Sequence, residues 1–98
     1  MKQGDAIAKL EGCAAAVRAR GATSLYLFGS TGRDEAGPES DVDLFLDYDA
    51  ARKFSLLDLA GIKNLLEDRL GARVDLTTRD SLHPALRADI EKSARRVF

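Results

Sequence analysis

The residues of this chain best placed to do chemistry are two closely spaced aspartates at the start of an apolar stretch. Asp41 and Asp43 are separated by Val42, so in a β-strand over residues 41–46 both carboxylates point to the same side. Two carboxylates held this close repel each other unless a cation lies between them. Hard oxygen ligands with room for phosphate oxygens suit Mg²⁺, so the pair predicts a metal site that also binds a nucleoside triphosphate.

A third aspartate, Asp75, has the same predicted orientation. Residues 73–77 alternate polar and apolar side chains, which is typical of a half-buried strand. If Val74 and Leu76 face the core, Asp75 faces the other way, and neighbouring strands are only about 4.8 Å apart. We therefore expect Asp75 to join the other two carboxylates and to help deprotonate an acceptor hydroxyl. Such carboxylates can bridge two metal ions about 3.5–4 Å apart, the spacing used for in-line displacement at phosphorus.

Four further residues around the Gly-Ser turn could bind phosphate or shape the turn. Gly29 allows the backbone to approach a phosphate closely, and Ser30 offers a hydroxyl and a backbone amide. Arg33 can neutralise phosphate charge, and Ser40 can fix the entry to the strand through local hydrogen bonds. Taken singly, each is also explained as an ordinary turn or solvated loop residue; their order before the aspartates favours the functional interpretation.

The pattern of apolar residues predicts the elements that position this site. We expect a helix over residues 5–20, strands over 24–28, 41–46 and 73–77, and a helix from the capping box at Ser55 to Gly71. A last helix is predicted to begin near Pro84, with Leu86 and Ile90 on its inner face. This order indicates an α/β fold, a small mixed sheet with helices mainly on one face, and leaves the aspartates on a partly open face.

Length, composition and charge limit the possible functions. With 98 residues, 45% of them hydrophobic and 32% charged, we expect residues 1–98 to form a single domain. One cysteine, Cys13, excludes an internal disulfide and fits a reducing cytoplasm. No apolar run is long enough to span a membrane. A net charge of −1 argues against direct nucleic-acid binding, which depends on basic excess.

Together these motifs resemble the minimal nucleotidyltransferase domain of the polymerase-beta-like superfamily. The resemblance rests on the ordered set Gly29, Ser30, Arg33, Ser40, Asp41, Asp43 and Asp75, and it extends from about Ser24 to the C-terminus. It implies the nucleotidyltransferase fold and transfer of a nucleoside monophosphate, expected to be AMP from ATP, with two Mg²⁺ ions. The family often has glycine after the arginine, whereas this chain has Asp34, which places a negative charge near the expected phosphates.

The resemblance also implies a partner. Stand-alone proteins of this kind often act as antitoxins paired with a helical HEPN ribonuclease toxin, and the expected acceptor is a tyrosine of that toxin. Two alternatives stay open: a binding module that neutralises its partner by steric contact, and a nucleotide-binding subunit of a two-chain transferase. The sequence encodes no base preference, acceptor identity or oligomeric state, and it assigns no role to His83, its single histidine.

Overall fold

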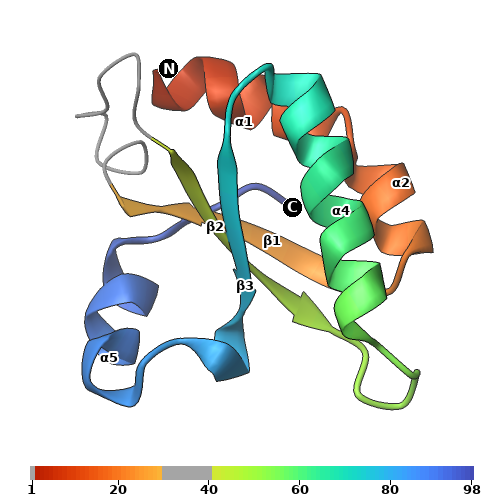
Figure 1. The fold of residues 1–98 in the computed structure, drawn as a ribbon. Helices are drawn as coiled ribbons and strands as arrows, with labels where there is room; N and C mark the ends of the chain where they lie inside the picture. Colours follow the sequence, from red (N-terminus) through yellow and green to blue (C-terminus); the bar gives the residue numbers. More distant parts are fainter. Residues whose placement is uncertain (1, 30–40) are drawn as a thin grey trace.

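The computed structural model describes residues 2–29 and 41–98, which form a mixed α/β fold (Figure 1). Its elements in chain order are α1 (Gln3–Glu11), α2 (Ala14–Ala19), β1 (Ala22–Phe28), β2 (Val42–Tyr48), α4 (Leu56–Leu70), β3 (Val74–Thr78), the 3₁₀ turn η1 (Arg79–Ser81), α5 (Pro84–Ser93) and β4 (Arg95–Arg96).

The four strands form one sheet in the order β3-β2-β1-β4. Strands β1 and β2 are antiparallel, β2 and β3 are parallel, and β4 runs antiparallel to β1. Helix α4 connects β2 to β3, because parallel strands need a crossover long enough to return to the same end of the sheet. The predicted mixed sheet is therefore confirmed. The sequence did not predict β4, because a strand of two residues is too short to show an alternating pattern.

One face of the sheet is buried against α1, α2 and α4, which lie together in Figure 1. Alternate strand residues supply this face, because successive side chains of a strand point to opposite sides. The fully buried members include Leu25, Leu27, Leu44 and Leu46 from the strands, and they form one cluster with Leu10, Val17, Ile62 and Leu66 from the helices. The same alternation sends the aspartates of β2 and β3 to the other face.

The predicted helix over residues 5–20 is two helices, separated at Gly12 and Cys13. Glycine costs about 1 kcal/mol relative to alanine inside a helix, which favours a break at Gly12. Cys13 is buried there, and burial raises the pKa of its thiol. Leu10 and Val17, on either side of the break, are both fully buried.

Helix α4 begins and ends as predicted. The Ser55 hydroxyl accepts a hydrogen bond from the backbone N–H of Asp58, and the Asp58 carboxylate accepts one from the Ser55 N–H at 2.8 Å. Gly71 ends the helix in the left-handed conformation with φ +65°. A Cβ on Gly61 would lie 2.8 Å from the Arg20 guanidinium, in agreement with the close packing that a mid-helix glycine suggests. No helix in the described part of the chain is long and apolar enough to cross a membrane.

The prediction that Leu86 lies on the inner face of the last helix is wrong. Helix α5 does begin at Pro84, with the backbone N–H of Ala85 donating to His83 Nδ1 at 3.1 Å. Leu86 is 54% exposed and Ile90 is only partly buried. The reason is that α5 is held to the sheet by a charged contact through Glu91 and has no buried residue of its own.

That contact belongs to Arg79, which lies over part of the sheet face opposite the main core. Its guanidinium lies 4.8 Å from the ring centre of Tyr26 and 5.0 Å from that of Phe45, which stack on each other. The same group donates to Asp47 at 2.7 and 3.1 Å and to Glu91 at 2.6 Å. These carboxylates raise the pKa of Arg79, so it stays charged. Because the guanidinium lies over both rings, the face predicted to be partly open is covered at its aromatic part.

We expect Arg79→Met to destabilise the protein by about 2–3 kcal/mol, because it leaves the partly buried Asp47 without its arginine donor and leaves Glu91 paired with Arg87 alone of its two arginine partners. Urea unfolding measures this. Lys63→Met is the control: it removes a longer ion pair, 3.8 Å, between a half-exposed lysine and Glu67, which keeps its hydrogen bond from the Val74 N–H, and it should cost less than about 0.5 kcal/mol. Equal losses of unfolding free energy in the two variants would show that the contacts of Arg79 stabilise the fold no more than a surface ion pair does.

The capping box predicts a pH dependence. Hydrogen bonding from the Ser55 N–H lowers the pKa of Asp58 below its ordinary value of 3.8. The carboxylate therefore stabilises the fold above that pH, and the stabilisation is lost as the pH falls through the lowered folded-state pKa. In urea unfolding, Asp58→Asn should be clearly less stable than the wild type at pH 6, and the difference should shrink as the pH falls below 3.8. A difference that does not change with pH would contradict this role of the charge.

Candidate functional site

The strand register brings Asp43 and Asp75 side by side. Asp43 pairs with Asp75 across the parallel strands β2 and β3, and with Phe28 across the antiparallel strands β1 and β2. Their neighbours Val42, Leu44, Val74 and Leu76 are buried against the helices, so the row Phe28–Asp43–Asp75 lies on the opposite face. Asp43 is half-buried and Asp75 is exposed, so this row is reachable from solvent.

Asp41 precedes β2 at the edge of this face. Its carboxylate lies 4.0 Å from Arg73 Nε, with side chains 50% and 85% exposed, so the ion pair is weak. Within residues 2–29 and 41–98, no three acidic, histidine or cysteine side chains are grouped closely enough to hold a metal ion. Asp43 and Asp75 are the pair that the register aligns, and the three-aspartate arrangement stays a prediction.

Gly29 occupies the end of β1 directly beside Asp43. Its φ of +73° is a left-handed conformation that residues with a Cβ rarely adopt. A Cβ built at this position would overlap the Asp43 carboxylate and come within 3.1 Å of its Cβ. Glycine is therefore needed here twice, for the backbone turn and for the position of the Asp43 side chain. The turn and the aspartate form one packed unit.

The remaining predicted site residues lie outside the described part of the chain. Ser30, Arg33 and Ser40 belong to residues 30–40, as does Asp34. Their expected roles in phosphate binding and turn formation therefore remain predictions. Gly29 and Asp41, which flank this segment, both lie at the edge that carries Asp43.

The donor set on this face fits a hard divalent cation. Mg²⁺ in nucleotide sites is commonly held by one or two carboxylates, with phosphate oxygens and waters completing its shell. Asp43 and Asp75 supply two carboxylates on adjacent strands, and Asp41 supplies a third nearby in sequence. The face can therefore hold a metal-bound triphosphate beside an acceptor hydroxyl.

Phe28 is a neighbour of this site that the motifs alone did not indicate. It pairs with Asp43, and its ring centre lies 5.7 Å from that of Phe45. Phe45 continues through Tyr26 to Arg79, so the carboxylate row is bordered by an aromatic surface. The usable signal was the alternation of Tyr26 and Phe28 in the strand that ends just before Gly29.

Comparison with known proteins places this fold in a recognised group. The sequence pattern of the nucleotidyltransferase domain matches residues 10–97. A candidate protein adenylyltransferase of Methanocaldococcus jannaschii is 41% identical over 70 residues, which cover 70% of this chain and 69% of the relative. The protein adenylyltransferase MntA of Thermococcus cleftensis is 40% identical over 62 residues, 63% of this chain and 61% of the relative.

Two solved structures share the fold to different degrees. A candidate minimal nucleotidyltransferase is 35% identical with a TM-score of 0.83, and the match covers 97% of this chain and 95% of that one. The MNT antitoxin complex with a tri-AMPylated HEPN toxin of Shewanella oneidensis gives 19% identity and a TM-score of 0.63, covering 90% of this chain and 68% of that one. The second likeness concerns the fold alone.

We expect Gly29→Ala to weaken Mg²⁺-ATP binding at least tenfold, because the new Cβ displaces the Asp43 carboxylate. Gly71→Ala is the matched control: Gly71 also has a left-handed φ, of +65°, but no atom lies within 4 Å of its missing Cβ. Both variants should lose about 1 kcal/mol of stability from backbone strain. Isothermal titration calorimetry with ATP and Mg²⁺ measures the binding. Equal affinity in the two variants would mean that the contact between Gly29 and Asp43 has no role in the site.

Proposed function

Because this chain belongs to the family of nucleotidyltransferase domains, we propose that it transfers AMP from ATP to a hydroxyl group of a protein. The observation that carries the proposal is the pairing of Asp43 with Asp75 beside the Gly29 turn. Relatives that bear the name protein adenylyltransferase are 41% identical to this chain over 70 residues and 40% identical over 62 residues, which supports a protein as the acceptor.

In this proposal the chain acts mainly by positioning. Asp41, Asp43 and Asp75 hold two Mg²⁺ ions, which neutralise the triphosphate and favour the ionised form of the acceptor. Gly29 and Ser30 cradle the terminal phosphates, Arg33 offsets their charge, and Ser40 fixes the start of β2. Asp75 accepts the proton of the attacking hydroxyl. The acceptor oxygen bonds to the α-phosphorus, the bond from that phosphorus to the β-phosphate oxygen breaks, and pyrophosphate leaves.

We further propose that the acceptor is a tyrosine of a HEPN-type ribonuclease toxin, so that the chain acts as an antitoxin. Two comparisons support this step: the relative MntA bears the name protein adenylyltransferase, and an MNT antitoxin of the same fold forms a complex with an AMPylated HEPN toxin. An open carboxylate face on the sheet suits this chemistry, since the side chain of a second protein can reach Asp75 from solvent.

The test is intact-mass analysis of the protein encoded beside this chain, after incubation with the chain, ATP and Mg²⁺. We expect the mass of one or more AMP groups on that protein. Asp43→Asn should reduce the rate at least about a hundredfold, because a metal ligand and a charge are lost. Asp89→Asn, an exposed aspartate on α5, should leave the rate unchanged.

Two other results would replace this proposal. If Asp43→Asn still protects cells from the toxin as well as the wild type, the chain neutralises its partner by contact alone. If the wild type modifies nothing by itself but does so as part of a stable two-chain complex with an added acceptor, it is a nucleotide-binding subunit. Circular dichroism of the variant checks that its fold is retained.

A further inference from the structure

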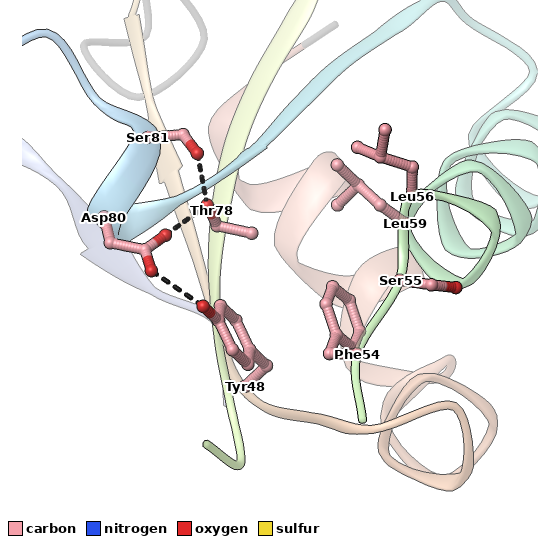
Figure 2. Close-up of a pocket in the computed structure, with 8 residues that line it drawn as sticks. All are labelled: Tyr48, Phe54, Ser55, Leu56, Leu59, Thr78, Asp80 and Ser81. Carbon is pink, nitrogen blue, oxygen red and sulfur yellow. Dashed lines mark hydrogen bonds between the residues drawn. The ribbon is translucent and has the colours of Figure 1, made fainter. Parts of the chain in front are cut away.

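A pocket of about 350 Å³ lies at the end of β2 opposite the carboxylate row (Figure 2). It is formed by Tyr48 from β2, Phe54 and Ser55 before α4, Leu56 and Leu59 of α4, and Thr78, Asp80 and Ser81 at the end of β3 and in η1. Tyr48 lies five residue steps along the extended strand from Asp43, a distance of about 17 Å. The pocket is therefore distinct from the proposed catalytic face.

One side of the pocket is apolar. Tyr48 and Phe54 stack with ring centres 4.9 Å apart, and in Figure 2 Leu56 and Leu59 lie on the same side as Phe54. Leu56 is 83% exposed, and the next residue, Leu57, is 84% exposed although it does not line the pocket. The cap of α4 uses Ser55 and Asp58, so the two leucines take no part in it and their side chains remain available for contact. The apolar surface thus continues from the pocket onto the outside of the helix.

The other side of the pocket carries a negative charge. Among the described residues that line it, Asp80 is the charged one, and its carboxylate accepts hydrogen bonds from Thr78 at 2.5 Å and from the Tyr48 hydroxyl at 2.7 Å. The hydrogen bond from Thr78, and to a lesser extent that from Tyr48, lowers the pKa of Asp80, so the carboxyl is ionised at neutral pH. Arg87, which lines a neighbouring depression with Asp80, also helps to lower the pKa of that carboxyl, but Arg87 does not line this pocket.

We propose that Leu56, Leu57 and this pocket form a docking surface for a protein partner that presents a bulky apolar side chain next to a lysine or arginine. The apolar side chain enters between Phe54 and Leu56, and the basic group pairs with Asp80. A small ligand would be mostly enclosed by its pocket, whereas the two exposed leucines extend the contact outside it, as a protein interface requires. The identification of this partner as the AMP acceptor rests on the proposed function.

The chain offers a matched pair of variants for the test. Leu56 and Leu86 both lie in the first turn of a helix and are both exposed, but only Leu56 borders the pocket. Aspartate is favoured near a helix N-terminus, so Leu56→Asp and Leu86→Asp should both fold, which thermal unfolding verifies. Any difference between them in binding therefore reports on the surface and not on the helix.

The experiment is calorimetric titration of the protein encoded beside this chain into each variant, without ATP. We expect Leu56→Asp to weaken binding at least tenfold and Leu86→Asp to change it less than twofold. Asp80→Asn should weaken binding several-fold and reduce its dependence on salt, because one charge pair is lost. Unchanged affinity in Leu56→Asp, equal losses in the two leucine variants, or no binding by the wild type would each overturn the docking proposal.

AMP transfer, measured on the same proteins, separates this proposal from the proposed function. With both correct, Leu56→Asp raises the KM for the partner, while Asp43→Asn abolishes transfer but binds the partner like the wild type. Binding that depends on Leu56, with no transfer by the wild type, would sink the proposed function and leave the docking surface standing. AMP transfer with a KM that Leu56→Asp leaves unchanged would overturn the docking surface and leave the proposed function standing.

Discussion

The arrangement of the sheet face opposite the main core depends on the side chain of Arg79. A positive charge with only a quarter of its side chain exposed requires partners, and it finds them on two other elements, in Asp47 of β2 and Glu91 of α5. Its flat guanidinium also covers the rings of Tyr26 and Phe45. One residue after β3 thus fixes α5 and closes the aromatic part of the face. What it leaves open is the row that contains Asp43 and Asp75.

The second constraint is the parallel pairing of β2 and β3 through α4. A slip of one residue in this register would turn Asp75 toward the helices and Leu76 toward solvent, at the cost of burying a charge. The apolar residues on either side therefore hold the carboxylates in line, and Gly29 leaves the space that the Asp43 side chain fills. The core of this nucleotidyltransferase and the geometry of its carboxylates are set by the same alternation.

The difference between local patterns and contacts between distant residues explains what the sequence could predict. Alternation in residues 41–46 and 73–77 and the Ser55–Asp58 capping box are local patterns, so the strands, the start of α4 and the direction of Asp75 follow from them. The pairing of Arg79 with Asp47, 32 residues away, has no local signal. Without knowledge of this ion pair, the apolar spacing in α5 predicts a buried face that includes Leu86, and this prediction is wrong. The break at Gly12 escaped because the apolar spacing of Leu10 and Val17 fits one continuous helix equally well.

Strand β2 connects the carboxylate face to the pocket beside α4, with Asp43 near its first residue and Tyr48 at its last. Nucleotidyl transfer requires little covalent chemistry from the protein and depends on how precisely the acceptor is placed. If the proposed function and the proposed docking surface both hold, a contact at the far end of the same strand fixes a protein acceptor about 17 Å along the sheet from the carboxylates. A partner bound there can reach Asp75 only with a hydroxyl that lies a comparable distance from its own apolar anchor. The two proposals together therefore predict that the length of β2 selects which hydroxyl is modified, without a catalytic face that encloses the acceptor.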